Sequence, residues 1–245
     1  MTGPVHPPCD EGAIRARPPA DAPTRRKRLA LAATVLGSSM AFIDGSVINV
    51  ALPTMRTALK ADAAQVQWIV NAYLLLLGAL VLIGGSAGDR YGRRRVFVLG
   101  VGLFAAASLG CALAPDAGWL IAARALQGVA AALLVPASLA ILGSTFDDQE
   151  RGAAIGAWAG FGAVTTAIGP VLGGWLVDHV SWRAIFLINL PLAAATVWLA
   201  LAAVRESRDP EVERLDWRGA VLAAAGLGAT TWGLTAAGER GWTSG

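Results

Sequence analysis

The sequence is poor in the residues that metal centres, disulfide frameworks and soluble surfaces require. Its 245 residues include two cysteines, Cys9 in the tail and Cys111 in the third apolar run, and two histidines, His6 and His179, with no ligand pattern around either. Zinc sites and disulfide frameworks need such residues at short spacing, so no metal and no cofactor is expected. A phosphate-binding loop and a nucleophile elbow are also missing from the sequence, so an enzyme is not expected. Charged residues make up 15% of the chain, against roughly 25% in ordinary soluble domains.

Long apolar runs take the place of that charge. Hydrophobic residues make up 55% of the chain, and the mean hydropathy is +0.55. A helix needs about 20 apolar residues to cross the hydrocarbon core of a bilayer, whereas a membrane barrel would show alternating segments of about ten. The sequence therefore predicts an all-α integral membrane protein with spans at Leu29–Val50, Val66–Ala87, Val96–Ala114, Leu120–Leu142, Ala153–Val177, Ala184–Val204 and Ala220–Ala237.

The runs and the charged stretches between them divide the chain into four segments. These are a disordered cytoplasmic tail over 1–28, a six-helix bundle over 29–204, a cytoplasmic loop over 205–219 and a seventh transmembrane helix over 220–245. The tail is rich in proline, alanine and charge, a composition that disfavours a packed core. A cleaved signal peptide is disfavoured, because the leader is long and Asp44 interrupts the first apolar run.

Lysine and arginine are distributed unevenly between the two sides of the predicted bundle. If the N-terminus is cytoplasmic, the basic clusters around Arg25, Arg93 and Arg208 all lie inside. Cytoplasmic loops carry an excess of Lys and Arg, so we expect a multi-pass protein of the cell membrane with a cytoplasmic N-terminus. The basic runs are explained by topology, and no nucleic-acid partner is expected. Few basic residues are left for the outer side: Arg56, Lys60, Arg183 and Arg240.

One short stretch, GDRYGRRR from Gly88 to Arg95, concentrates five charges between the second and third apolar runs. It has two interpretations. Any cytoplasmic loop collects arginine, so the stretch can be a topology signal alone. Alternatively, Asp89 anchors the guanidinium groups by charge-assisted pairing, and the order G-x-x-x-D-R-x-G-R-R is more specific than positive charge alone requires.

Two charged residues lie inside apolar runs. Asp44 falls midway along the first run and Arg124 lies in the fourth. Buried charges of this kind cost several kcal/mol unless they are paired or hydrated, and they mark functional sites by default. Asp44 can carry a proton or meet a cationic substrate. Alternatively it is a structural acid held by Ser38, Ser46 or Asn49, and Arg124 is a structural or snorkelling cation.

The fifth run contains a glycine-rich stretch with an internal proline. Small residues permit close helix crossing, and proline removes a backbone hydrogen bond. Close packing explains part of this pattern, but a GPxxGG run is more than packing needs. The residues are Gly169, Pro170, Gly173 and Gly174.

Several of these stretches resemble motifs of the major facilitator superfamily, in its fourteen-span drug/proton antiporter branch. GSAGDRYGRRRV is similar to the loop between helices 2 and 3, and FIDGSVINVALP to the first-helix motif. LIAARALQGVAAALLVPASLAIL resembles the fourth-helix motif, and AIGPVLGGWL the antiporter motif of helix 5. Two positions depart from the pattern: Ala87 where the loop motif usually has Leu, and Thr165 where the helix-5 motif usually begins with Gly.

The resemblance implies a superfamily-type six-helix N-terminal bundle that works by alternating access, followed by a seventh transmembrane helix. It implies proton-coupled export of amphipathic or cationic small molecules across the lipid bilayer, driven by the proton motive force without a cofactor. An uptake symporter of the same superfamily and a non-transporting membrane scaffold or sensor stay open as alternatives. The resemblance assigns Asp44 and Arg124 to proton or substrate coupling, and Gln127 and Gly128 to the helix-4 motif. It assigns an antiport role to the helix-5 residues Gly169, Pro170, Gly173 and Gly174. It also implies a cytoplasmic latch formed by Gly85, Asp89, Arg90, Gly92, Arg93 and Arg94.

The chain stops after the stretch that resembles the first of two extra helices in that branch. We therefore expect either a truncated sequence or a chain that pairs with a complementary one. In both cases a C-terminal half, which would supply part of the substrate cavity and the partner of the latch, is required for transport.

Overall fold

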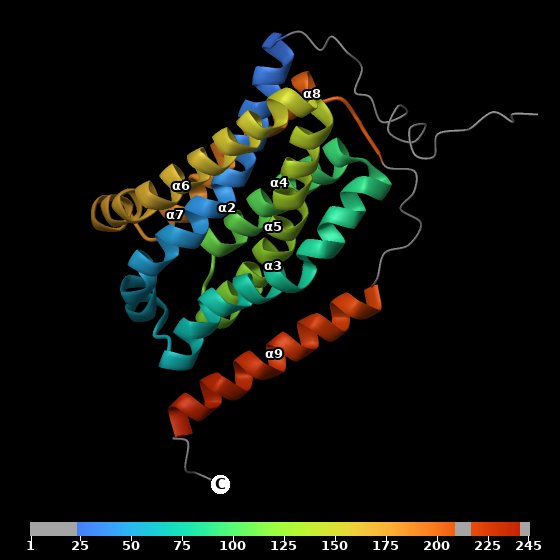
Figure 1. The fold of residues 1–245 in the computed structure, drawn as a ribbon. Coiled ribbons are helices and arrows are strands. Elements are labelled where there is room, and N and C mark those ends of the chain that lie inside the picture. Colours follow the sequence, from blue (N-terminus) through green and yellow to red (C-terminus); the bar gives the residue numbers. More distant parts are fainter. Residues whose placement is uncertain (1–23, 209–216, 241–245) are drawn as a thin grey trace, which may run out of the picture.

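Helices are the regular elements of the computed structural model, which describes residues 24–208 and 217–240 (Figure 1). The prediction of an all-α fold is confirmed. In chain order the helices are α2 (Thr24–Leu59), α3 (Ala63–Tyr91), α4 (Arg93–Ala112), α5 (Ala117–Thr145), α6 (Asp148–His179), α7 (Ala184–Leu187), α8 (Asn189–Ala203) and α9 (Trp217–Arg240).

In the described part of the chain, six helical stretches are long and apolar enough to cross a membrane. They are α2, α3, α4, α5, α6 and the combined stretch Ala184–Ala203. Most of these helices run past the predicted spans at both ends: α2 has 36 residues, about 54 Å at 1.5 Å per residue. Because α9 is not among the six, its crossing of the membrane stays a prediction.

Two further differences from the prediction concern the N-terminal tail and the sixth span. The tail predicted over 1–28 is helical from Thr24 onward, and its other residues lie outside the described ranges. The sixth span is interrupted at Ile188, between α7 and α8. Pro191 explains this break, because proline has no N–H to donate to the carbonyl of Leu187 and its ring crowds that carbonyl.

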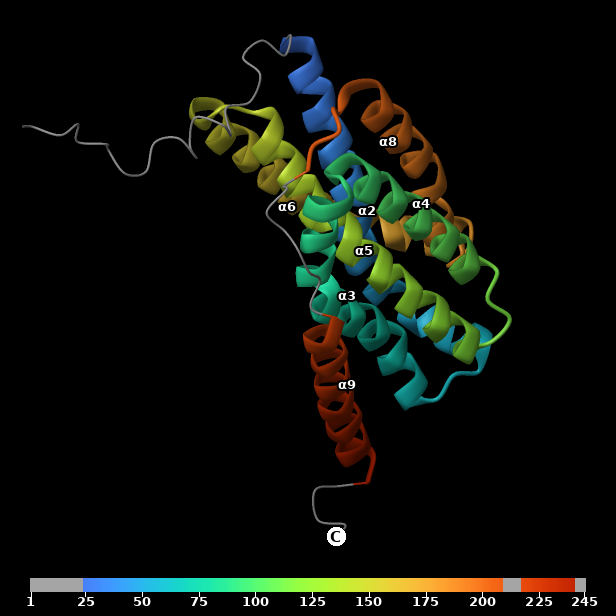
Figure 2. The same ribbon diagram turned by 90° about the vertical axis from the view of Figure 1, so that its right-hand side faces the viewer.

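Close contact between α3 and α5 forms the centre of the bundle, with α4 packed against the other side of α5 (Figure 2). Glycine permits this approach. A Cβ at Gly84 would lie 2.6 Å from the carbonyl carbon of Ala132, and one at Gly128 would lie 3.2 Å from the backbone nitrogen of Leu77. Helix α2 packs against α6, α8 and α5, so α2 and α5 bring their buried faces together.

Helix α9 lies along α3, at one side of the bundle (Figures 1 and 2). Its Gly228 approaches Leu75 of α3, where a Cβ would lie 3.6 Å from Leu75 Cδ1. Four large apolar side chains of the described part of α9 are exposed: Val221, Leu222, Leu227 and Trp232. An exposed apolar surface of this kind suits a lipid or protein environment.

The predicted orientation can be tested at two exposed positions at opposite ends of the bundle. In a Cys9→Ser background, Arg95→Cys should resist an impermeant thiol reagent in intact cells, because the arginine turn is predicted to be cytoplasmic. Lys60→Cys, at the end of α2, should label. Permeabilised cells supply the control, since both cysteines should then react. Labelling of position 95 but not of position 60 in intact cells would reverse the orientation.

Candidate functional site

Asp44 of α2 and Arg124 of α5 form a buried ion pair. The Nη1 atom of Arg124 donates to Oδ2 of Asp44, and both side chains are completely shielded from solvent. The residues are separated by 80 positions in the chain, and the packing of α2 against α5 brings them together. An isolated ion in an apolar interior would bear the full cost of losing its hydration. In this pair the attraction between the two charges offsets part of that cost.

Gln127 connects the two members of the pair. Its Oε1 accepts from Nη1 of Arg124 at 2.8 Å, and its Nε2 donates to Oδ1 of Asp44 at 3.2 Å. The same amide accepts from Sγ of Cys111 at 3.2 Å and donates to Oγ of Ser108 at 2.8 Å. With all four of its hydrogen bonds made, the Gln127 amide has a single defined orientation.

The Arg124 guanidinium is also held from α3. Its Nε donates to the carbonyl of Ile69 at 3.2 Å, and its Cζ lies 4.3 Å from the centroid of the Tyr73 ring. Nη2 is buried without a hydrogen-bond partner. Because arginine cannot be deprotonated in a protein, this buried cation depends on the Asp44 carboxylate for its charge balance.

A further side chain, Asn189 at the start of α8, extends the network. Its Nδ2 donates to Oγ of Ser108 at 3.2 Å. The network thus joins α2, α4, α5 and α8 through one set of polar contacts. Sequence reasoning missed Ser108, Cys111 and Asn189, and the only signal for them was a few small polar residues inside apolar runs.

The partners considered for Asp44 as a structural acid are wrong. Ser38 Oγ pairs with Ser138 Oγ at 2.9 Å and accepts from Trp158 at 3.0 Å. The other two side chains bond to the backbone of their own helix: Ser46 to the carbonyl of Ile43 and Asn49 to that of Gly45.

The predicted latch residues lie at the turn between α3 and α4. Asp89 Oδ1 accepts from Nε of Arg93 at 2.9 Å and lies 2.8 Å from its Nη2. The turn itself is made at Gly92, whose φ of 112° is a conformation that favours glycine. Arg90 stacks on the ring of Tyr91, with 5.5 Å between its Cζ and the ring centroid. The sixth latch position, Gly85, has room for a side chain, because a Cβ there would lie 3.7 Å from Pro136.

The glycine-rich run of α6 packs against α2. A Cβ at Gly169 would lie 3.0 Å from Cβ of Ser46, and one at Gly173 would lie 3.3 Å from the carbonyl oxygen of Val47. Gly174 is less constrained, since its Cβ would meet Val50 at an ordinary 3.8 Å. Pro170 lies inside α6. Close helix packing therefore accounts for Gly169 and Gly173, and the antiport role of the run stays a prediction.

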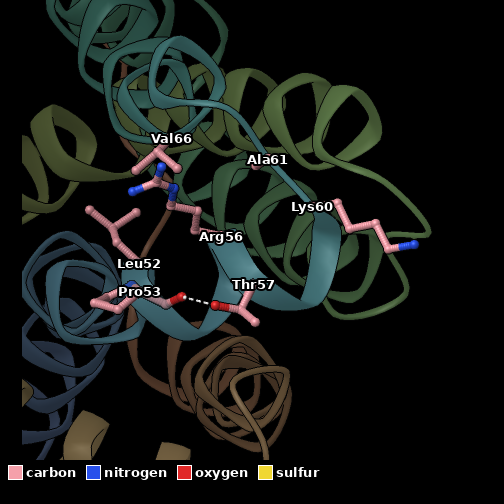
Figure 3. A pocket seen from close by; sticks show the side chains of 7 residues that line it. All are labelled: Leu52, Pro53, Arg56, Thr57, Lys60, Ala61 and Val66. Atoms are coloured by element: carbon pink, nitrogen blue, oxygen red, sulfur yellow. Dashed lines mark hydrogen bonds between the residues drawn. The ribbon is translucent and has the colours of Figure 1, made fainter.

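An open hollow of about 660 Å³ lies at the end of α2, away from this network (Figure 3). Thr57 Oγ1 donates to the carbonyl of Pro53 at 3.2 Å within it. None of the predicted site residues lines the hollow, and no cluster of potential metal ligands is found in the described ranges. The lining residues are Leu52, Pro53, Arg56, Thr57, Lys60, Ala61 and Val66.

A bundle of long apolar helices around a buried ion pair defines the class as a multi-pass helical membrane protein. The chain belongs to the Major Facilitator Superfamily, whose sequence profile matches residues 34–242. This membership confirms the predicted family and places the chain among transporters rather than enzymes.

Relatives of the chain carry names that refer to drug resistance, efflux or export. The chain is 38% identical to the multidrug resistance protein Stp of Mycobacterium tuberculosis over 90% of its own length and 41% of the relative's. It is 42% identical to the drug efflux pump JefA of the same organism, over 80% of this chain and 39% of the relative. The tetracenomycin C resistance and export protein of Streptomyces glaucescens is 36% identical, over 95% and 44% respectively. The chain thus spans about two fifths of these relatives.

Solved structures confirm the fold. A bacterial homologue of the human drug peptide transporters PepT1 and PepT2 matches with a TM-score of 0.64 at 15% identity. The match covers 84% of this chain and 49% of that one. At this identity the likeness concerns the arrangement of helices alone.

Proposed function

We propose that the chain acts as the N-terminal bundle of a proton-coupled antiporter that exports amphipathic or cationic small molecules. The observation that carries the proposal is the buried Asp44–Arg124 pair with Gln127 between its members. The names of two relatives, which refer to efflux and export, support the direction of transport. The greater length of all three relatives supports the need for a C-terminal half.

Asp44 is the member of the pair that can change its charge. Arg124 keeps its proton under all physiological conditions, whereas a carboxylate can bind one. Protonation of Asp44 removes the ionic attraction between α2 and α5 while Arg124 keeps its contacts with Ile69 and Tyr73. Breaking a buried pair costs about 3–5 kcal/mol, and each 1.4 kcal/mol changes an equilibrium about tenfold. Proton binding can therefore shift the balance between two arrangements of these helices.

The test is solute-coupled proton movement in oriented vesicles that contain the protein expressed from its complete reading frame. Addition of a cationic dye to inside-out vesicles with an imposed pH gradient should release protons, and Asp44→Asn should abolish that release. The charge-balanced variant Asp44→Asn/Arg124→Gln should also abolish it, although this variant leaves no unpaired buried charge. Normal coupling in the double variant would rule out Asp44 as the proton site.

The direction of movement separates export from the alternatives. Proton-driven dye accumulation in inside-out vesicles supports an exporter. Accumulation in the same direction as the proton flux would indicate a symporter, and no movement of any solute by a correctly inserted complete protein would favour the scaffold.

The latch is tested by Asp89→Asn in the same complete protein. Every arginine is kept, so insertion and orientation should be normal. The substitution removes the charged acceptor of Arg93, an interaction of about 1–3 kcal/mol, and transport should fall roughly tenfold or more. Spin labels on the two halves should report a shift toward the inward-facing arrangement. Asp148→Asn, at an exposed carboxylate near the same end of the bundle, is the control. Unchanged transport in Asp89→Asn would leave the turn as a topology signal.

A further inference from the structure

The segment that follows α8 lies across the turn between α3 and α4. The carbonyl of Ser207 accepts from the backbone N–H of Arg93 at 3.0 Å, and the carbonyl of Val204 accepts from Nη1 of Arg94 at 3.3 Å. Oγ of Ser207 also donates to Oγ of Ser144, near the end of α5, at 3.3 Å. We call residues 204–207 the strap, because they connect the end of α8 to the first turn of α4 and to α5.

Glu206 supplies the charged contact of the strap. Its Oε1 accepts from the backbone N–H of Arg94 at 3.1 Å. Oε2 is buried and lies 3.8 Å from Nε of Arg94 and 3.7 Å from Nε of Arg95. The N-cap residue of α4, Gly92, has no side chain to cap the helix. Glu206 therefore caps α4 from a distant part of the chain, where an acidic group also complements the helix dipole.

The backbone of the turn leaves space for this carboxylate. A Cβ at Gly92 would lie 2.5 Å from Oε1 of Glu206 and 2.7 Å from its Cδ. Glycine is therefore needed at position 92 for two reasons, its positive φ and the room that Glu206 occupies. No comparable signal was available from the sequence, in which Glu206 is one of several charges after the sixth apolar run.

Asp89 and Glu206 contact different arginines of the first turn of α4. Asp89 holds Arg93, and Glu206 holds Arg94 and lies beside Arg95. We propose that Glu206 is a positioning residue of the arginine turn, and that the strap must detach before Arg94 and Arg95 can move to other partners. The turn between α3 and α4 is thereby coupled to the strap that follows α8. Only the relevance of this coupling to transport rests on the proposed function.

Disulfide cross-linking tests the strap without a transport assay. Because the two Oγ atoms lie 3.3 Å apart, Ser144→Cys/Ser207→Cys in a Cys9→Ser background should cross-link under mild oxidation. In this background Glu206→Ala should slow cross-linking about fivefold, the effect of losing one helix cap. Glu206→Gln, which keeps the amide oxygen as an acceptor, should give an intermediate rate. Gly92→Ala should slow it as well, because the added methyl group displaces the carboxylate.

The control variant is Asp148→Asn, since the Asp148 carboxylate is 90% exposed and its Oδ1 lies 3.0 Å from Nη2 of Arg151 on the same helix. It should leave the cross-linking rate unchanged. Each variant is expressed from the complete reading frame and purified in detergent. Monodisperse elution shows that the variant is folded, and full thiol titration after denaturation shows that its cysteines are equally reactive. Equal cross-linking rates in the parent and in Glu206→Ala would overturn the proposal, whether or not the protein proves to be an antiporter.

Discussion

Asp44→Asn is expected to lower the free energy of unfolding more than Arg124→Gln does, although both substitutions break the same ion pair. Asp44→Asn leaves a buried guanidinium that cannot lose its proton, and the expected loss is about 3–5 kcal/mol. Arg124→Gln leaves a carboxylate that can bind a proton and become neutral, so the expected loss is about 1–3 kcal/mol. The difference follows from the unequal chemistry of the two side chains.

The double variant Asp44→Asn/Arg124→Gln completes a thermodynamic cycle. Both charges are absent, so its stability should exceed that of Asp44→Asn, and the two single losses should not add. Thermal denaturation of the detergent-purified proteins, followed by the loss of monodisperse material, provides the measurement. A double variant whose loss is the sum of the two single losses would show that Asp44 and Arg124 do not depend on each other. Equal losses in the two single variants would contradict the expected difference between the two side chains.

Gly84→Ala is expected to destabilise the bundle by about 3 kcal/mol, near the upper end of the usual cost of overpacking. The added Cβ would lie 2.6 Å from the carbonyl carbon of Ala132 and 3.2 Å from Cα of Leu133. These are backbone atoms, so no side-chain rotation can relieve the overlap, and α3 must move away from α5. That movement would also disturb the contacts of Arg124 with Ile69 and Tyr73 on α3.

Gly78→Ala provides the matched control on the same helix. A Cβ at Gly78 meets nothing within 4 Å, and alanine favours a helix over glycine by about 1 kcal/mol. This variant should be as stable as the parent or slightly more stable in the same thermal assay. If the two substitutions had the same effect on stability, close contact between α3 and α5 would not explain the need for glycine at position 84.

The sequence was sufficient to locate Asp44 and Arg124 but not to pair them. A charged residue inside an apolar run can be recognised from the sequence alone, because its transfer into lipid is costly wherever its helix lies. Its partner, however, depends on which helices touch and on how each is rotated. In the structural acid interpretation the partners of Asp44 were nearby in the chain, at Ser38, Ser46 and Asn49. The actual partner, Arg124, is 80 residues away.

The neutral polar residues of the network other than Gln127 were beyond sequence reasoning for a related cause. Ser108, Cys111 and Asn189 lie in apolar runs that also contain other small polar residues, so nothing distinguishes them in the sequence. They become part of the site because α4 presents Ser108 and Cys111 to Gln127 of α5, and α8 places Asn189 against Ser108. Glu206 could not be recognised for a different reason, because it is one of many charged residues in a stretch predicted to be a loop.

The sequence by itself determined the class of the protein and the approximate course of its helices. Hydropathy and run length are local properties of the chain, and they decide which segments can cross a bilayer. The motif order also identified the superfamily. Only the tertiary structure decided that Asp44 meets Arg124, that Gly84 and Gly128 bring α3 against α5, and that Glu206 caps α4. These facts depend on helix rotation and crossing, which arise from contacts summed over the whole bundle and are carried by no single stretch of residues.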